Sequence, residues 1–219
     1  MLTESKGNMY TWVTHTWNTI KGECPHGCTY CYMKRWGKQK PPRLDEKEFK
    51  TDLGNGNFIF VGSSCDMFAD DIPKVWIEKT LSYLSFENTY LFQSKNPSRM
   101  WNYRGEFPWS TKICTTIETN RFYPEIMQNC PKPLDRSLYG ARIGYKYEMY
   151  VTIEPIMDFD LTEMVKLIKW CNPKQVNIGA DSGHNNLPEP SKEKILELID
   201  ELKKFTVIDQ KRNLSRLLN

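Results

Sequence analysis

The amino-acid sequence predicts an α/β protein, an open partial TIM-type barrel of about (β/α)6 construction with parallel strands. Short runs of strand-forming residues alternate along the chain with helical patterns, as is typical of βαβ units that share one parallel sheet. A closed barrel of eight such units takes about 250 residues, whereas this chain has 219. We therefore expect a single domain over residues 1–219, with a core over residues 10–205 and a basic tail over residues 206–219.

Strands are expected where Val, Ile, Thr, Tyr and Phe accumulate, because β-branched and aromatic side chains pack well on a pleated surface. Such runs occur at residues 10–16, 58–61, 89–93, 112–117, 149–154 and 175–178. Residues 206–208 could add one more short strand. In parallel β/α folds the side chains that carry chemistry follow the carboxyl ends of the strands, and those positions are therefore the candidates for a functional site.

Helices are expected between the strands, where apolar residues recur at helical spacing. The clearest patterns lie at residues 73–85, 161–171 and 191–205. The last of these begins with Ser191 as a cap and an acidic first turn, which is a typical start of a helix. Weaker patterns predict helices at residues 45–53, 97–103 and 120–128.

The composition excludes several classes of protein. Hydrophobic residues make up 39% of the chain, charged residues 26% and aromatic residues 13%, which is unlike a disordered, collagen-like or coiled-coil chain. No apolar run approaches the roughly 18 residues of a membrane-spanning helix, and the first residues are polar. We therefore expect a cytoplasmic protein without a membrane partner. The net charge of +3 is too small to identify a nucleic-acid partner, but it is compatible with one.

Three of the 7 cysteines lie in one short segment after the first predicted strand. Cys24, Cys28 and Cys31 form a C-x3-C-x2-C pattern, which in a reducing compartment is more typical of a metal site than of disulfides. Three thiolates from one loop can hold three irons of a [4Fe–4S] cluster and leave the fourth iron open to another ligand. The remaining cysteines are scattered: Cys65, Cys114, Cys130 and Cys171.

Two other interpretations of the cysteine segment stay open. The three thiols together with His26 or His15 could form a Cys3His zinc site, although structural zinc usually uses two separate C-x2-C knuckles and the sequence has no second one. The cysteines could also be unrelated core residues. Pro25 and Gly27, however, are typical of a tight loop rather than of a core element.

With Tyr30 before the last cysteine, the motif C-x3-C-x-aromatic-C resembles the signature of the radical S-adenosylmethionine (radical SAM) enzymes. The resemblance implies that Cys24, Cys28 and Cys31 ligate a [4Fe–4S] cluster whose open iron binds the amino and carboxylate groups of SAM. Reduction of the cluster then cleaves SAM to methionine and a 5′-deoxyadenosyl radical, which abstracts hydrogen from a substrate. It also implies an external one-electron reductant of the flavodoxin or ferredoxin type.

The resemblance further implies roles for residues after the second and third strands. Radical SAM enzymes commonly carry a Gly-Gly-Glu-like segment after the second strand, and this segment binds the SAM amino group. This chain lacks the glutamate, so Ser63 and Ser64 would supply the acceptor oxygens. Lys95 could pair with the SAM carboxylate or with a substrate phosphate. An ordinary serine turn and a solvated lysine are the alternatives.

Carboxylates and glycines follow the later strands. Glu118 and Glu154 each lie at the end of a strand, where one of them could accept both hydroxyls of the SAM ribose and the other could bind substrate or a cation. A helix cap or a salt bridge is the alternative for each. Gly179 permits close approach of the backbone to an adenine edge, and it belongs with Asp181 to a Gly-Ala-Asp-Ser-Gly turn.

The strand-end motifs taken together resemble one branch of the family. They are similar to small radical SAM proteins encoded by phages and mobile elements, whose reaction is unassigned, and more distantly to spore photoproduct lyase, a DNA-repair enzyme. The resemblance covers Trp12 to Ser191. It implies that Cys65, after the second strand, donates a hydrogen atom to a product radical, with a buried packing role as the alternative.

Basic residues interleaved with Tyr32 and Trp36 follow the cysteine segment: Lys34, Arg35, Lys38, Lys40 and Arg43. Such segments bind nucleic acids through phosphate contacts and base stacking. We therefore expect a nucleic-acid or nucleotide substrate, and a peptide is the alternative substrate. A non-catalytic zinc or iron–sulfur module that binds nucleic acid is the alternative from another class, and a solvated basic face is the plainest interpretation of the segment.

Overall fold

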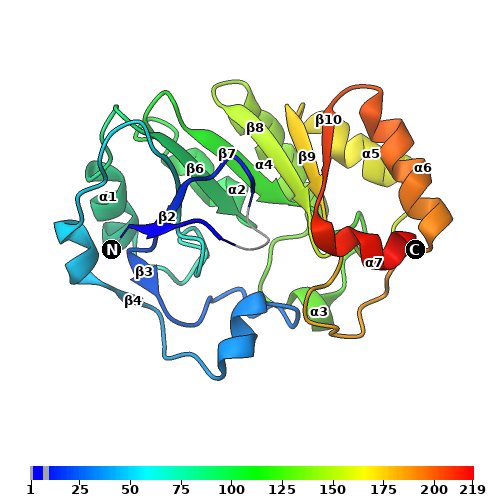
Figure 1. The fold of residues 1–219 in the computed structure, drawn as a ribbon, viewed down its shortest axis with the longest axis horizontal. Helices are drawn as coiled ribbons and strands as arrows, with labels where there is room; N and C mark the ends of the chain where they lie inside the picture. Colours follow the sequence, from blue (N-terminus) through cyan, green and yellow to red (C-terminus); the bar gives the residue numbers. More distant parts are fainter. Residues whose placement is uncertain (1, 7–9) are drawn as a thin grey trace.

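The computed structural model describes residues 2–6 and 10–219, and these form an α/β fold around one sheet (Figure 1). The sheet has 8 strands in the order β1-β2-β5-β6-β7-β8-β9-β10. Neighbours from β2 to β10 pair in parallel, whereas β1 pairs with β2 in the antiparallel direction. The strands are β1 (Thr3–Glu4), β2 (His15–Trp17), β5 (Phe58–Val61), β6 (Thr89–Ser94), β7 (Lys112–Thr116), β8 (Glu148–Ile153), β9 (Gln175–Ile178) and β10 (Val207–Gln210). The predicted fold class is therefore confirmed.

Helices cover the outer face of the curved sheet. Consecutive helices contact each other along this face in the order α2, α4, α5, α6 (Figure 1). The helices are α1 (Lys74–Ser82), α2 (Pro97–Asn102), α3 (Pro124–Met127), α4 (Pro133–Gly144), α5 (Leu161–Trp170), α6 (Lys192–Lys203) and α7 (Ser215–Leu218). Short 3-10 helices are η1 (Tyr32–Trp36), η2 (Glu46–Lys50) and η3 (Arg212–Leu214). In the described part of the chain, no helix is both long and apolar enough to cross a membrane.

Alternate residues of each strand pack on opposite faces of the sheet, as the two-residue period of a strand requires. The outward set packs against the helices in the main core and includes Ile59, Val61, Ile113 and Val151. The inward set forms a smaller core with Tyr10 and Val13 of the N-terminal segment: Phe60, Leu91, Cys114 and Tyr150. The strands therefore bury both faces, as parallel strands do.

A second sheet of two antiparallel strands, β3 (Ile20–Lys21) and β4 (Arg43–Leu44), brackets the cysteine segment. Residues 22–42 form the connection between these strands, and they include Cys24, Cys28 and Cys31 as well as η1. The cysteines therefore lie on a closed loop whose two ends are hydrogen-bonded to each other.

Three sequence predictions differ from the structure. The strand predicted at residues 10–16 is present only as β2, and Tyr10 lies before β2 and packs on the inner face of the sheet. Instead of the α-helix predicted at residues 45–53, the structure has the shorter 3-10 helix η2. The helix predicted at 120–128 is only the short α3, because Tyr123 before it has a non-helical backbone with φ of −112° and ψ of 89°, and Gln128 ends it with φ of 53°.

The prediction also missed α4 altogether. Its sequence contains Gly140 and Gly144, which weaken a helical pattern. Packing explains Gly140, since a Cβ there would lie 3.0 Å from Cys171 Sγ and 3.2 Å from Met149 Cε. Tertiary contact of α4 with β7, β8 and α5 therefore overrides the local preference.

Replacing Gly140 by Val is expected to lower the free energy of unfolding by about 1–3 kcal/mol, because the larger side chain overpacks the contact with Cys171 and Met149. Urea unfolding of the metal-free chain measures this. Gly105→Ala is the control, since a Cβ at Gly105 meets no atom within 4 Å. Equal effects of the two substitutions would show that α4 does not pack as described.

Candidate functional site at the carboxyl ends of the strands

The cysteine loop begins with a close approach between backbone segments. Gly22 has φ of 116°, and a Cβ there would lie 2.5 Å from the carbonyl oxygen of Pro41. The neighbouring Glu23 amide donates to the Lys40 carbonyl at 2.8 Å. A residue other than glycine at position 22 would separate these segments, so the local sequence fixes how the loop leaves β3.

A second segment, residues 123–130, braces the outer side of this loop. The Thr29 amide donates to the Ile126 carbonyl at 3.0 Å, and the Asn129 amide donates to the His26 carbonyl at 3.0 Å. The Asn129 side-chain amide also donates to the Pro25 carbonyl at 3.0 Å. The sequence gives no signal of these hydrogen bonds, because they join segments that are distant in the chain and are made largely by backbone groups.

The loop cysteines contact two of the cysteines that are scattered in the sequence. Cys28 Sγ lies 3.2 Å from Cys130 Sγ, and Cys65 is a close enough neighbour of Cys24 to lower the pKa of the Cys24 thiol. The bond to Cys130 lowers the pKa of Cys28 to about 6, against the opposing effect of burial. Cys28 therefore has the thiolate character that a metal ligand needs.

The three loop thiols are a donor set that an iron–sulfur cluster accepts. Among residues 2–6 and 10–219, no three His, Cys, Asp or Glu side chains converge on one point that could hold a metal ion. A [4Fe–4S] cube has no such requirement, because each thiolate binds a different iron and the sulfurs stay apart. His26, considered above as a zinc ligand, has Nε2 bonded to Asp66 Oδ2 at 2.8 Å.

Asp66 connects the cysteine loop to the ends of β5 and β6. Its carboxylate contacts His26 and also accepts hydrogen bonds from Ser94 Oγ at 2.9 Å and from the Lys95 amide at 2.8 Å. Burial disfavours the imidazolium, but Asp66 raises the pKa of His26 to about 9. The same charge interaction, working against burial, holds the pKa of Asp66 below its ordinary value. The His26–Asp66 pair is therefore ionised at neutral pH.

A fully buried ion pair lies beneath the loop. Glu118 and Arg136 are both 0% exposed, and Arg136 Nη1 donates to Glu118 Oε2 at 2.6 Å. On the other oxygen, Glu118 accepts from the Tyr30 hydroxyl and lies 3.2 Å from Lys95 Nζ. Burial raises the pKa of a carboxyl group, yet Arg136 and Lys95 together hold the pKa of Glu118 at about 2. Tyr30, Lys95 and Glu118 are thus brought together, with an arginine that the sequence analysis missed.

The serines after β5 are tied to the end of β2. Asn18 Oδ1 accepts hydrogen bonds from the Ser64 amide at 3.0 Å, the Ser64 hydroxyl at 3.1 Å and the Ser63 hydroxyl at 3.2 Å. The Tyr32 hydroxyl donates to the Ser63 carbonyl at 2.7 Å. Ser63, Ser64 and Cys65 therefore lie beside the cysteine loop.

Glu154 lies with a second group at the other side of the rim. Its carboxylate pairs with Lys211 Nζ at 2.6 Å and accepts from Asn213 Nδ2 at 2.9 Å. Gly179 permits this packing, because a Cβ there would lie 2.8 Å from Glu154 Oε1. The tail that the sequence left without a role thus contributes side chains to the rim.

Asp181 organises its own loop. It accepts from the Gly183 amide at 2.9 Å and from Asn185 Nδ2 at 2.8 Å. It also lines a small hollow of about 120 Å³ together with Arg216 and Glu189. Asn213, which bonds to Glu154, also donates to the carbonyl of Ala180, the residue before Asp181, at 2.7 Å. The Asp181 loop is therefore connected to Glu154.

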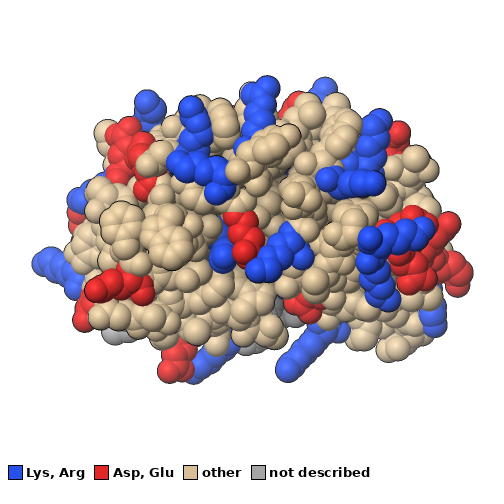
Figure 2. Space-filling model, turned by 90° about the horizontal axis from the view of Figure 1, so that it is seen from above, with Lys and Arg blue, Asp and Glu red and all other residues tan. Residues whose placement is uncertain are grey.

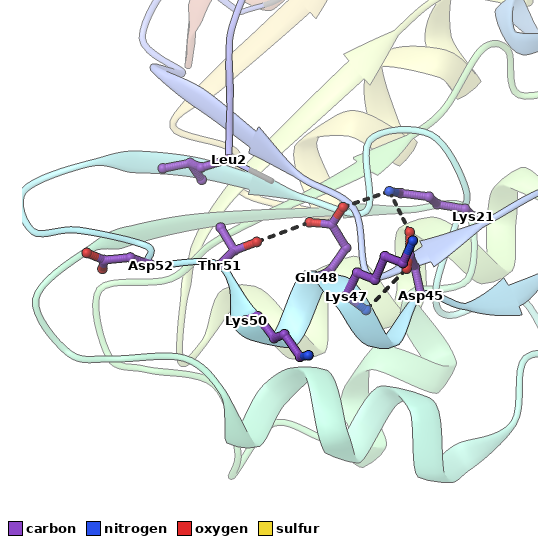
Figure 3. Close-up of a pocket in the computed structure, with 8 residues that line it drawn as sticks. All are labelled: Leu2, Lys21, Asp45, Lys47, Glu48, Lys50, Thr51 and Asp52. Carbon is purple, nitrogen blue, oxygen red and sulfur yellow. Dashed lines mark hydrogen bonds and ion pairs between the residues drawn. The ribbon is translucent and has the colours of Figure 1, made fainter.

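A larger hollow of about 600 Å³ lies beside η2 and is drawn in Figure 3. Lys21 points toward Asp45 and Glu48 and bonds to them at 2.8 and 2.7 Å. Burial opposes the charge of Glu48, but Lys21 holds the pKa of Glu48 below its ordinary value. These charged groups neutralise one another. The bonds of Lys21 to Asp45 and Glu48 therefore fasten η2 to β3.

The basic segment after the cysteines is exposed on and after η1. Trp36 is 60% exposed, and the Arg35 guanidinium stacks 4.6 Å from its ring. Lys34, Lys38, Lys40 and Arg43 are also exposed. On the face shown in Figure 2, by contrast, acidic and basic side chains are interspersed. The aromatic and basic groups that the sequence predicts thus occupy one accessible segment.

Comparison with known proteins shows what this fold is similar to. No family model and no curated protein matches the chain. Among solved structures, spore photoproduct lyase with bound AdoMet and dinucleoside spore photoproduct shares 11% identity with a TM-score of 0.59, over 91% of this chain and 64% of that one. A cysteine-to-serine mutant of the same lyase shares 12% identity with a TM-score of 0.61, over 94% of this chain and 66% of that one. The chain therefore shares the lyase fold and spans less than two thirds of the length of those lyases.

Replacing Arg136 by Met is expected to lower the free energy of unfolding by about 3–5 kcal/mol, because it leaves the Glu118 charge buried without its main partner. Denaturant unfolding of the metal-free protein measures the loss. Arg142→Met is the control on the same helix, since Arg142 is exposed and a surface arginine contributes about 0–1 kcal/mol. Losses of similar size in both variants would contradict the network described here.

Proposed function

We propose that this chain is a radical SAM enzyme that acts on a nucleic acid or a nucleotide. The observation that carries the proposal is the position of Cys24, Cys28 and Cys31 at the carboxyl edge of a parallel, barrel-like sheet. In such folds ligands bind at that edge. The fold shared with a lyase that was solved with bound AdoMet supports the same conclusion.

Cys24, Cys28 and Cys31 would hold a [4Fe–4S] cluster, and Cys28 is prepared for this by its lowered pKa. When bound, the cluster and SAM supply the reductive cleavage that yields a 5′-deoxyadenosyl radical. The protein orients these groups and limits access of water and other quenchers. The bracing segment 123–130 keeps the loop in place, and the His26–Asp66 pair fixes it to the strand ends.

Lys95 is the side chain best placed to bind the SAM carboxylate. Burial disfavours its charge, but Glu118 and Cys28 raise the pKa of Lys95 above its ordinary value, so it stays charged. An ammonium has three donors, and its contact with Glu118 leaves donors for an anionic ligand. Ser63 and Ser64 are proposed to face the SAM amino group through hydroxyl or carbonyl oxygens.

Glu118 is proposed to act mainly through its neighbours, and Glu154 by direct contact with the ligand. Arg136, Lys95 and Tyr30 already engage both oxygens of Glu118, so this carboxylate positions Lys95 and Tyr30 at the rim. Glu154 is partly exposed and is the better candidate for the ribose. Gly179 and Asp181 lie beyond Glu154, and an adenine edge is proposed to approach there.

Cys65 is proposed as the hydrogen-atom donor to a substrate radical. It lies beside Cys24, and the hydrogen bond to Cys24 together with burial raises the pKa of Cys65 well above its ordinary value. The thiol therefore keeps its hydrogen at neutral pH. A thiol rather than a thiolate is the form that a carbon radical can use.

The wider assignment follows from the same proposal. A cytoplasmic enzyme with an external flavodoxin- or ferredoxin-type reductant fits it, as does the branch of small phage- and mobile-element-encoded proteins that the sequence resembles. A peptide substrate and a non-catalytic metal-binding module are the competing functions. The SAM-dependent chemistry separates the module from the enzyme, and substrate binding separates the two substrate classes.

Anaerobic reconstitution with iron and sulfide is expected to give about four irons per chain, and reduction with dithionite in the presence of SAM to give 5′-deoxyadenosine. Cys28→Ala is expected to lose both, because it removes a cluster ligand. Cys171→Ala is the control, since Cys171 is buried under α4 and bonds to Ser137. One zinc per chain without SAM cleavage would instead support the non-catalytic module.

Replacing Trp36 by Ala is expected to weaken binding of a single-stranded oligonucleotide by roughly 5- to 150-fold, because one stacked base contributes about 1–3 kcal/mol. Fluorescence anisotropy at fixed salt measures the change. Trp109→Ala is the control, since Trp109 is 81% exposed and lies in the loop before β7, at the opposite end of the strands. Binding that both variants retain in full would show that Trp36 does not stack on the oligonucleotide, whereas absence of oligonucleotide binding by the parent chain would favour a peptide substrate.

A further inference from the structure

We propose that Cys130 is the redox partner of Cys28, and that these two thiols form a reversible disulfide when the cluster is absent. The two sulfurs lie 3.2 Å apart although the residues are 102 positions apart in the chain. A disulfide requires an S–S distance of about 2.05 Å, so a shift of about 1.2 Å brings the sulfurs together. Side-chain rotation supplies a movement of this size without a change of fold.

The backbone holds the two cysteines opposite each other. The residue before Cys130, Asn129, is hydrogen-bonded to the loop at His26 and Pro25, and Thr29 is bonded to Ile126. These contacts flank both cysteines, so the encounter of the thiols is intramolecular and preorganised. Met127, Met157 and Leu187 pack around the pair and exclude larger reactants.

Exposure limits which oxidant can react. Cys28 and Cys130 are each 6% exposed, so a small neutral oxidant such as hydrogen peroxide can reach them while a protein thiol cannot. One peroxide molecule oxidises the Cys28 thiol to a sulfenic acid and leaves as water. The Cys130 thiol then attacks the Cys28 sulfur, the S–S bond forms, and the sulfenic oxygen leaves as a second water.

The remaining cysteines show why this pair is specific. Cys114 lies on the inner face of the sheet, and Cys171 bonds to Ser137. Cys24 and Cys65 form the competing pair, since these two thiols are also neighbours. The disulfide of Cys28 with Cys130 would occupy one cluster ligand and shield it from irreversible oxidation. That consequence rests on the proposed function, whereas the disulfide itself does not.

The test uses the full-length, metal-free, reduced chain treated with one equivalent of hydrogen peroxide and digested with trypsin without reductant. The expected product joins residues 22–34 to residues 122–136, with fragmentation placing the bond at Cys28 and Cys130. A main product that joins residues 22–34 to 51–74, which contain Cys65, would overturn the proposal. So would the absence of any cross-link while free thiols are lost.

Iron uptake after the same treatment gives a second readout. The parent chain is expected to lose uptake and to recover it fully with dithiothreitol, which reduces the disulfide to two thiols. When a second equivalent of hydrogen peroxide is added, the parent chain is still expected to recover, whereas Cys130→Ser is expected to lose uptake without recovery, because its Cys28 sulfenic acid takes an oxygen atom from the second peroxide, which leaves as water, and becomes a sulfinic acid. Full recovery in Cys130→Ser would overturn the protective role.

Two controls keep these outcomes interpretable. Cys171→Ser is expected to behave as the parent chain, and Cys130→Ala replaces Cys130→Ser if the serine variant fails to fold by circular dichroism. If no variant or parent takes up iron even before oxidation, the proposed function fails while the peptide map still tests the disulfide. The two failures are therefore distinguishable.

Discussion

Glu118 carries a negative charge in a place that water does not reach, and the arrangement of the site depends on how that charge is balanced. Charges are transferred into a protein interior at a cost of several kcal/mol, which only close and well-oriented partners offset. Arg136 comes from α4, Lys95 from the end of β6 and Tyr30 from the cysteine loop. One carboxylate thus fixes the relative positions of three separate elements.

Such a network is weak evidence for stability, because an apolar replacement of the whole group can be as stable. It specifies one arrangement, however, since each partner left alone would be a buried unpaired charge or hydroxyl. The cysteine loop is held in the same way on its other sides, by Asp66 through His26 and by the backbone contacts of residues 123–130. Protein contacts therefore hold the loop in position on several sides.

The sequence predicted the features that are local. The alternation of strands and helices indicated the fold class, and the parallel arrangement predicted that Ser63, Lys95, Glu118 and Glu154 lie at one edge of the sheet. It did not reveal their partners. Asn18, Arg136 and Lys211 bond to these residues across the fold, and such pairings leave no periodic or spacing signal in one sequence.

Cys130 shows the same limit most clearly. In the sequence it is an isolated cysteine before a proline. The preceding helix α3 was predicted with wrong bounds, and the following helix α4 was not predicted. Only the packing of residues 123–130 against the loop brings it to Cys28. A cysteine of this kind can be recognised from tertiary structure, because its environment is made by residues distant in the chain.

The position of Lys211 and Asn213 has a consequence for how the molecule is made. They follow Glu154 by 57 and 59 residues, and they can join it only after β10 has paired with β9. During synthesis on the ribosome the cysteine loop emerges long before the residues that complete the opposite rim. The nascent chain therefore carries these thiols without the completed rim around them until Lys211 and Asn213 have been translated.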